Sequence, residues 1–252
     1  MEIVTVTNQK GGCAKTTTAF SLGMGLAKRG KHVLFVDLDA QSNLAFTAGV
    51  DLLHMEHTLY DVFKGKTDVE SALIHLDNGT DILVGSIDLA SADREFSQLG
   101  RERMLKKALA PLAKQYDFCV IDTPPTLGVL NENALTACNK VIIPVQSEIY
   151  GLQGISQLCG FIDDIRENAN PDLTISGILI TVVDASTNVY KEMRKQFENV
   201  AETLGTKVFK TCIRRAVSVK EVALMRGNLF DEVPNATATQ DYTAFIDEFL
   251  ED

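Results

Sequence analysis

The chain has 252 residues, 45% of them hydrophobic and 23% charged, a composition typical of a globular protein with one large α/β domain or two small ones. No apolar run approaches the roughly 20 residues needed to span a bilayer, and the N-terminus carries no signal-peptide pattern. The five cysteines are scattered, with no Cys-x-x-Cys pair. We therefore expect a cytoplasmic protein with reduced thiols, and not a membrane-spanning or disulfide-stapled one.

The net charge of −10 is unevenly distributed. Residues 190–227 hold nine basic and four acidic side chains, a local charge of +5, which leaves −15 for the remainder. The overall charge disfavours a nucleic-acid partner, but this stretch could supply a local basic surface.

Apolar runs alternate with segments of helical period along the whole chain. Strands are expected at 3–7, 33–37, 82–85, 118–122, 141–145, 175–183 and, as a short one, 207–209. Helices are expected at 16–29, 58–62, 69–73, 101–114, 152–168, 190–204 and 242–250. This alternation predicts an α/β fold: a mostly parallel twisted sheet with helices on both faces, in a single domain over 1–252.

The segment after the first strand has the order that phosphate binding requires: an apolar strand, a loop of small residues, a Lys-Thr pair and a helix. Gly11 and Gly12 allow backbone N–H groups to converge on an anion. Lys15 is placed to reach the β- and γ-phosphates, and the Thr16 hydroxyl to bind Mg²⁺. We therefore expect ATP contacts from Lys10, Gly11, Gly12, Cys13, Ala14, Lys15, Thr16 and Thr17.

This loop departs from the ordinary pattern G-x-x-x-x-G-K-[ST], since Gln9 and Ala14 occupy the two glycine positions. It reads Lys-Gly-Gly-x-x-Lys-Thr-Thr and resembles the deviant Walker A motif of the ParA/MinD family, Lys-Gly-Gly-x-Gly-Lys-[Ser/Thr]. The resemblance implies that Lys10 crosses a dimer interface to the partner subunit's nucleotide and acts in catalysis with Lys15. At Ala14 we expect either a negative φ or a tolerated strain.

Two aspartates, Asp37 and Asp39, stand at the end of the strand 33–37, where open α/β sheets bind ligands. The segment resembles the family's Val-Asp-x-Asp-Pro-Gln, with Ala40 in place of proline. The resemblance implies that Asp39 lies in the first switch, near Mg²⁺ and the attacking water, as a catalytic residue, and that Asp37 supports the loop. The alternative for Asp39 is a helix N-cap.

The strand 118–122 ends in Asp122-Thr123-Pro124-Pro125, which resembles the family's Walker B motif and second switch. A hydrophobic strand that delivers one carboxylate to its tip is suited to holding Mg²⁺ through water. Thr16, Asp39 and Asp122 are therefore the expected magnesium site.

Two later segments resemble the family's base pocket and DNA-binding face. The segment 178–184 resembles the strand leading to the adenine, with Ser186 replacing an arginine. Around Ile213, the sequence resembles an Ile-Pro-Arg segment, with Arg214 at the proline position, and the resemblance implies that Ile213 contacts the nucleotide. The expected DNA contacts are Arg214, Arg215 and Lys220, for which a solvated charged face is the alternative.

The resemblance covers residues 2–250 and is to the short, Soj-like group, because the chain starts at its first strand and we expect no extra N-terminal helix-turn-helix domain. Cys119 and Cys138 are expected to be buried inert thiols, since Cys119 lies within an apolar strand. Three histidines lack companion ligands at metal spacing and are expected on the surface: His54, His57 and His75.

The resemblance implies a nucleotide-switched ATPase for plasmid or chromosome partition: a homodimer with ATP and Mg²⁺, bound to nonspecific nucleoid DNA and stimulated by a ParB-like centromere-binding partner. One alternative is a ParA-like ATPase that positions another cargo. The other is a MinD-like membrane-associated ATPase, which the acidic C-terminal segment 241–252 disfavours because an anionic bilayer would repel it.

Overall fold

The structure, a computed structural model, describes residues 1–147 and 151–251. The strands of these residues form one seven-stranded sheet in the order β3-β4-β2-β5-β1-β6-β7. All neighbouring strands are parallel except β3 and β4. The strands are β1 Glu2–Val6, β2 Val33–Asp37, β3 Leu73–His75, β4 Asp81–Val84, β5 Phe118–Asp122, β6 Lys140–Gln146 and β7 Thr174–Thr181.

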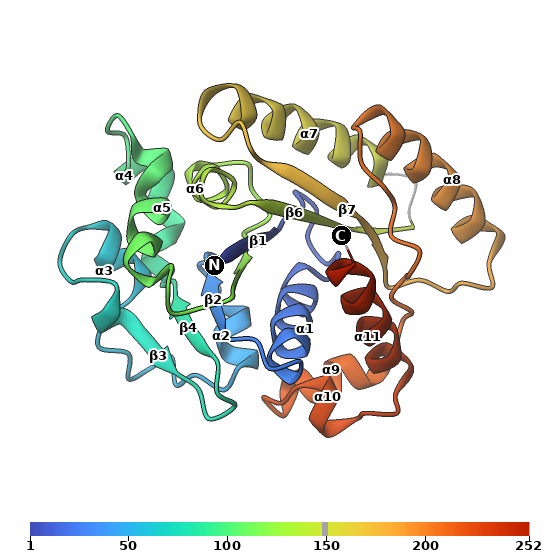
Figure 1. The fold of residues 1–252 in the computed structure, drawn as a ribbon, viewed down its shortest axis with the longest axis horizontal. Coiled ribbons are helices and arrows are strands. Elements are labelled where there is room, and N and C mark those ends of the chain that lie inside the picture. Colours follow the sequence, from blue (N-terminus) through green and yellow to red (C-terminus); the bar gives the residue numbers. More distant parts are fainter. Residues whose placement is uncertain (148–150, 252) are drawn as a thin grey trace.

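Helices cover both faces of this sheet (Figure 1). In the described residues the α-helices are α1 Lys15–Lys28, α2 Asn43–Thr47, α3 Leu59–Phe63, α4 Ala92–Glu95, α5 Met104–Leu109, α6 Val129–Ala137, α7 Gly151–Asn168, α8 Asn188–Thr203, α9 Val217–Leu224, α10 Leu229–Glu232 and α11 Thr237–Leu250. Short 3-10 helices lie at Glu70–Ala72, Ile87–Ser91, Arg101–Arg103 and Ala110–Leu112.

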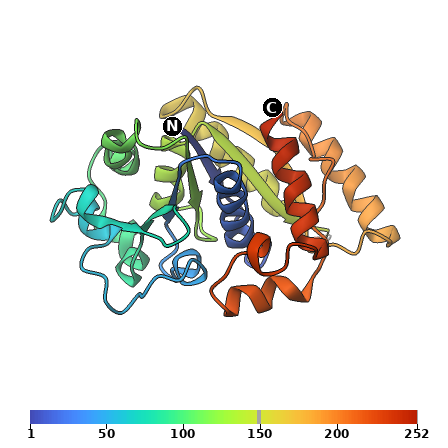
Figure 2. The ribbon, with the colours of Figure 1, turned by 60° about the horizontal axis from the view of Figure 1, so that its bottom comes forward.

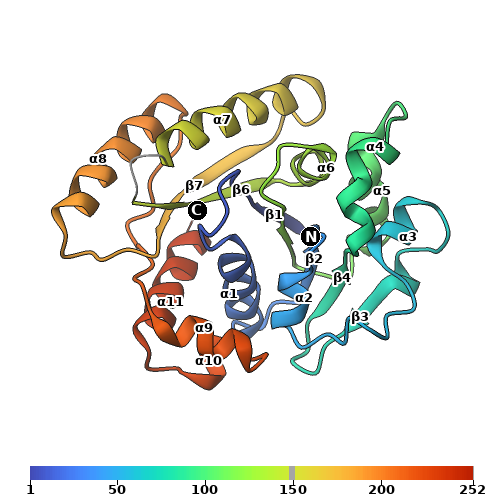
Figure 3. The ribbon, with the colours of Figure 1, turned by 180° about the vertical axis from the view of Figure 1, so that it is seen from behind.

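The core is divided by the sheet. One face packs against α1 and α11, through Phe20, Leu22, Tyr242 and Phe245 among others. The opposite face packs against α5 and α6 under β2 and β5, and against α7 and α8 under β6 and β7. Seen from below and from behind, α11 runs beside α1, with α9 and α10 at one end of the pair (Figures 2 and 3). The predicted α/β class, with a mostly parallel sheet and helices on both faces, is confirmed.

Several expected elements differ from the structure. The predicted helix 101–114 is a short α5 between two 3-10 turns, because Pro111 lacks the N–H that a continuous helix would use. The predicted helix 69–73 is a 3-10 turn that leads into strand β3. The expected strand at 207–209 is only an isolated bridge between Val208 and Ile178.

Helix α1 approaches its neighbours closely because two of its positions lack a side chain. A Cβ added at Gly23 would lie 2.2 Å from Cε1 of Phe35 on β2, and one added at Gly25 would lie 2.2 Å from Cδ1 of Ile246 on α11. Since α1 begins directly after the loop 8–14, this packing fixes the position of that loop relative to the sheet.

We expect Gly23→Ala to destabilise the protein by about 1–3 kcal/mol, because the rigid Phe35 ring must move to admit the methyl group. The matched control is Gly160→Ala on α7, where an added Cβ meets nothing within 4 Å. That change should stabilise the protein by up to about 1 kcal/mol through helix propensity. Urea unfolding of both variants checks the contrast, and equal effects would contradict the close-packing account.

Within the described part of the chain, no helix is long and apolar enough to cross a membrane. The described cysteines are free thiols, and Cys119 and Cys138 are buried, as expected. Burial raises the pKa of both thiols, so both remain protonated at neutral pH.

Candidate functional site: a phosphate loop at the tips of β1, β2 and β5

The loop between β1 and α1 closes on itself around the Lys15 side chain. Lys15 is 8% exposed, and its Nζ donates to the carbonyl oxygen of Lys10 at 3.1 Å. The same carbonyl accepts a contact from the Sγ of buried Cys13 at 3.1 Å. The ammonium group is thus already held over the loop, beside the N-terminus of the 14-residue helix α1.

Asn8 at the start of the loop and two side chains from neighbouring strands anchor this loop. Asn8 donates to the carbonyl of Pro144 at 2.7 Å and accepts from the Lys10 N–H at 3.0 Å. The Thr181 hydroxyl contacts the Cys13 carbonyl at 3.0 Å, and Gln146 donates to the Gly12 carbonyl at 2.7 Å. Anchors on β6 and β7 therefore preorganise the loop. This lowers the entropy cost of ordering the loop when a ligand binds.

Ala14 adopts the left-handed conformation, with φ 65° and ψ 31°. Of the two possibilities that the sequence left open, a negative φ is wrong and a tolerated strain is correct. An L-residue in this region costs roughly 1–2 kcal/mol relative to right-handed geometry. Ala14 precedes α1 directly, and its carbonyl accepts the Thr18 N–H at 2.8 Å, so the strained residue starts the helix.

Asp37 organises the loop that carries Asp39. Asp37 is fully buried at the tip of β2, and its Oδ1 accepts from the Asp39 N–H at 3.1 Å while its Oδ2 accepts from the Ala45 N–H at 3.0 Å. One carboxylate thereby joins the start of the loop to α2. The helix N-cap at this point is Ser42, and Asp39 instead accepts the Gln41 N–H at 3.0 Å, so Asp39 is not the cap of α2.

Asp122 lies opposite Asp37 in the parallel pairing of β2 with β5. Its Oδ1 accepts from the Thr123 N–H at 3.1 Å, whereas its Oδ2 is buried with no hydrogen-bond partner among the described residues. Such an orphaned oxygen is costly unless a cation or water satisfies it. The Thr16 hydroxyl and the Lys15 ammonium lie close enough to act on this carboxyl, so Thr16, Asp39 and Asp122 fit a Mg²⁺ ion bound through oxygen ligands and water.

The two buried carboxyl groups have raised pKa values. Burial raises the pKa of Asp122 to about 7, against the lowering effect of the Thr16 hydroxyl and of the Lys15 charge. The pKa of Asp37 is also raised, first by burial and then by the charge of Asp122. Two carboxylates facing each other without a cation cannot both ionise easily, which agrees with a site built to hold one.

The stability of the ligand-free protein should fall relative to Asp122→Asn as the pH rises from about 4 to about 7. The folded protein keeps a proton on Asp122 in this window that the unfolded chain has already lost, so rising pH favours the unfolded chain by up to about 1.4 kcal/mol per pH unit. Asparagine does not titrate and lacks this loss. Urea unfolding of both proteins across the window checks the prediction, and parallel curves would contradict it.

A cavity of about 710 Å³ joins the loop to the C-terminal part of the chain. Its lining includes Gly11, Gly12, Ala14, Lys15, Thr16, Thr17 and Asp39 from the predicted site, together with Ile213, Arg214, Arg215 and Lys220. Lys10 and Cys13 do not line it, and Asp122 lies buried beneath it. The structure thus brings together most of the residues that the sequence singled out.

Other lining residues were not among the predicted site residues, although Pro125 and Val182 lie in segments that the sequence had singled out. They are Asn43, Thr47, Pro125, Gln146, Val182, Ala216, Val219 and Tyr242. β7 ends at Thr181, two residues before the predicted limit at 183, and the next residue, Val182, has a positive φ of 55°, which is rare for a β-branched residue. The Val183 N–H then bonds the Ile213 carbonyl at 3.1 Å, which places Ile213 at the cavity.

The three expected DNA contacts are not equivalent. Arg214 makes a forked ion pair with Asp241 of α11, with Nη2 2.5 Å from Oδ1 and Nε 2.9 Å from Oδ2. Its backbone N–H also donates to this carboxylate, at 2.9 Å. The pair neutralises the Arg214 charge and ties the loop to α11, so the geometry gives Arg214 a structural role. Arg215 and Lys220 are exposed.

A family model described as an AAA domain matches residues 1–175. The chain is 40% identical over 227 residues to the sporulation initiation inhibitor protein Soj of Bacillus subtilis, and the match covers 87% of each chain. It is 36% identical over 221 residues to the chromosome partitioning protein ParA of Myxococcus xanthus, covering 87% of this chain and 77% of that one.

The chain belongs to the ParA/MinD family of P-loop proteins.

The fold of this ParA/MinD-family chain is shared with solved structures. A structure described as cobyrinic acid a,c-diamide synthase from Mycobacterium smegmatis, with bound ATP analog and magnesium, superposes with a TM-score of 0.86 at 34% identity. The match covers 100% of this chain and 95% of that one. Within the family pattern this chain is unusual at Ala14, where the structure shows strain, and at Arg214, where it shows an ion pair.

Proposed function

We propose that this single-domain protein, 1–252, binds and hydrolyses ATP with Mg²⁺. Support comes from the cavity, which combines the loop backbone, the Lys15 ammonium and the carboxylates near Thr16. Lys15 and the N–H groups of the loop hold the β- and γ-phosphates, and Ile213 contacts the base. Thr16, Asp39 and Asp122 would hold Mg²⁺, which would supply charge neutralisation for the phosphate oxygens. Asp39 orients the water that attacks the γ-phosphate.

ATP drives dimerisation through Lys10 in this proposal. The Lys10 side chain is half-buried, and its backbone is fixed at both ends by the bonds to Asn8 and Lys15. A lysine on such a fixed base can reach the γ-phosphate region of the partner subunit's nucleotide, where it acts with Lys15 and Asp39 in catalysis. Hydrolysis removes the γ-phosphate and with it the charge that Lys10 contacts.

The ATP dimer binds nonspecific DNA and acts as a partition switch on the nucleoid, with a ParB-like partner that stimulates hydrolysis. The observation that carries this proposal is the cavity itself, because exposed Arg215 and Lys220 line the same space as the phosphate loop. A change of the nucleotide bound at the loop therefore alters the cavity that these basic residues line. The name of the Myxococcus relative, a chromosome partitioning protein, supports the same reading.

Positioning of another cargo by the same switch is the second candidate, and it shares every step except the partner. A MinD-like membrane role has less support. The last described helix, α11, turns Tyr242, Phe245, Ile246 and Phe249 into the core against α1, so these apolar side chains are not available to a bilayer. We propose a cytoplasmic, nucleoid-associated protein without a membrane partner.

The test is binding to random duplex DNA, with and without ATP, at several salt concentrations. We expect ATP-dependent binding that ignores sequence and weakens steeply with salt, with a slope of about −0.9 per phosphate contacted. Arg215→Glu with Lys220→Glu should abolish it while ATP still drives dimerisation. The matched control, Lys106→Glu with Lys107→Glu on α5, makes the same charge change on another face and should retain binding.

Light scattering on Lys10→Ala tests the dimer step in the same series: this variant should bind ATP yet stay monomeric. If the wild-type ATP form shows no DNA affinity at low salt, the nucleoid-switch proposal fails, whereas nucleotide binding is judged separately by calorimetry.

A further inference from the structure

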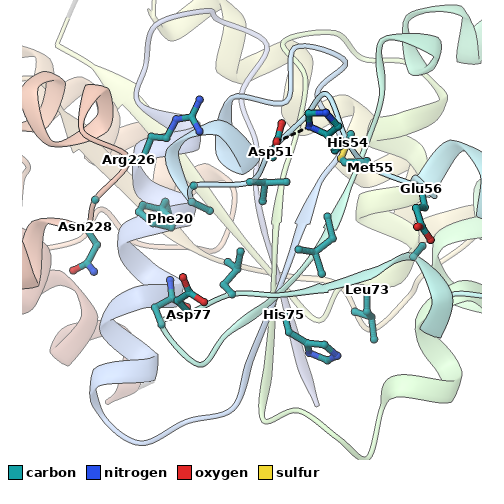
Figure 4. A pocket seen from close by; sticks show the side chains of 18 of the residues that line it. Phe20, Asp51, His54, Met55, Glu56, Leu73, His75, Asp77, Arg226 and Asn228 are labelled. Carbon is teal, nitrogen blue, oxygen red and sulfur yellow. Dashed lines mark hydrogen bonds and ion pairs between the residues drawn. The ribbon is translucent and has the colours of Figure 1, made fainter.

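A second groove, of about 670 Å³, shares no lining residue with the loop 8–14. Figure 4 shows side chains that line it. One wall is the segment 48–57 that follows α2. The floor and second wall come from α1 and β3, and the far end is closed by residues 226–232 at the α9–α10 connection. Neither the loop residues 8–14 nor the Mg²⁺ ligands proposed above line this groove, so it is a distinct feature of the surface.

The floor of the groove is apolar. Phe20 of α1 and Val50 are 6% and 5% exposed, and Met55, Ile74 and Leu76 lie beside them, partly buried. β3 is the outermost strand of the sheet, so the groove runs along a sheet edge and is open to solvent. An apolar floor in an open groove favours an occupant with apolar side chains of its own.

The rim is strongly acidic. The lining includes five carboxylates: Asp51, Glu56, Asp77, Asp231 and Glu232. Asp51 pairs with His54 at 2.7 Å and Asp231 pairs with Lys28. Glu56, Asp77 and Glu232 are exposed and make no ion pair with any described residue. These three carboxylates lie around an apolar floor whose lining includes one arginine, Arg226, so the excess of negative charge gives the groove a preference for cations.

We propose that this groove docks a cationic segment of a partner protein, in which apolar side chains alternate with lysine or arginine. The proposal rests on the proposed function, in which a partner acts on the nucleotide switch. Apolar side chains cover the floor while the cations meet Glu56, Asp77 and Glu232. Nucleic acid would be repelled by the rim, and a second copy of this chain, with its net charge of −10, is a poor counterpart.

The groove adjoins the switch through two contacts. Asp51 lies four positions beyond the end of α2 at Thr47, and α2 follows the loop that holds Asp39. Across the groove, the guanidinium of Arg226 stacks over the ring of Phe46 on α2, with Cζ 4.7 Å from the ring centroid. A segment seated here contacts Asp51 and Arg226, which connect to α2 through the chain that follows it and through the stack on Phe46.

The probe is a fluorescent short peptide of alternating lysine and leucine, titrated by polarisation without nucleotide or DNA. The variant is Glu56→Lys with Asp77→Lys and Glu232→Lys. The matched control is Glu167→Lys with Asp172→Lys and Glu202→Lys, three exposed carboxylates outside the groove, so both proteins carry the same net charge. A lysine–serine peptide tests the need for apolar side chains.

We expect the groove variant to bind the lysine–leucine peptide about tenfold more weakly than the control variant. The lysine–serine peptide should bind the wild type weakly. Equal weakening in both variants, equal binding of both peptides, or no binding to the wild type would each overturn the proposal. The neutral set Glu56→Gln, Asp77→Asn and Glu232→Gln repeats the test with a milder change.

ATP affinity, measured on the same proteins, separates the two levels of inference. A groove variant that keeps wild-type ATP affinity and loses the peptide supports the docking site. Wild-type protein that binds the peptide in the groove but fails to bind ATP contradicts the proposed function alone.

Discussion

Replacing Lys15 with alanine should lower the affinity for ATP by about ten- to a hundredfold while the fold survives. The ammonium is held inside the loop by the Lys10 carbonyl and Lys15 belongs to none of the three apolar core clusters, so we expect the fold to survive its removal. Hydrogen bonds between charged partners contribute about 1.5–3 kcal/mol each, which corresponds to this loss of affinity. Isothermal titration calorimetry with Mg²⁺-ATP measures the change directly.

The matched control is Lys31→Ala. Lys31 is exposed, three residues beyond the end of α1, and its replacement removes the same charge from the same part of the chain. ATP affinity of this variant should equal that of the wild type. A folded Lys15→Ala protein with unchanged ATP binding would reject the assignment of the phosphate site.

Asp39→Ala should still bind ATP, with turnover reduced by about a hundredfold or more, as expected when a residue that positions or activates the nucleophile is removed. The loop itself should survive, because Asp37 holds it through the backbone N–H groups of Asp39 and Ala45, neither of which depends on the Asp39 side chain. The variant should therefore accumulate as an ATP-bound dimer.

Phosphate release and light scattering on the same sample test the Asp39 prediction. Asp88→Ala serves as the control, since Asp88 is an exposed carboxylate outside the cavity and should leave turnover unchanged. Wild-type turnover in Asp39→Ala would remove Asp39 from the catalytic group and leave the attacking water to another residue.

Two central strands, β2 and β5, were predictable to the residue, whereas β1, expected at 3–7, runs Glu2–Val6. β2 and β5 were expected at 33–37 and 118–122 and are found there, because both are apolar runs buried on both faces and end in a polar residue at the same sheet edge. The site followed from them, since parallel strands bring Asp37 and Asp122 to one edge. Strand type and order of motifs were enough to place these carboxylates beside the phosphate loop.

The edge of the sheet was not predicted. β3 is three residues long, too short for a periodic pattern, and its partner β4 is reached by a tight turn at Asn78-Gly79. That dipeptide is a recognised hairpin signal, and Gly79 adopts the required positive φ of 80°. Helix α6 was not predicted for a different reason. Eight of its nine residues are buried, so it lacks the polar face that marks a surface helix.

The pairing of charges was also invisible in the sequence. Arg214 stood in a basic run and was expected to face DNA, but its partner Asp241 lies 27 residues later on another helix. A count of charges predicts the sign of a surface only when the ion pairs within it are known. All three cations are exposed, but those at the cavity without an ion pair to a described residue, Arg215 and Lys220, are a smaller set than the sequence suggested.

The order of strands in the sheet sets the earliest moment at which the protein can assemble during synthesis. β1, which leads into the phosphate loop, pairs with β5 on one side and β6 on the other, so Glu2 lies opposite Phe118 and Val4 opposite Lys140. A chain leaving the ribosome N-terminus first carries an unpaired β1 until both distant strands have emerged. Long-range parallel pairing of this kind is slow and leaves strand edges exposed meanwhile. The nascent first half therefore exposes the edges of β1, and the sheet that supports the phosphate loop is complete around β1 only after the chain has been extended beyond Gln146.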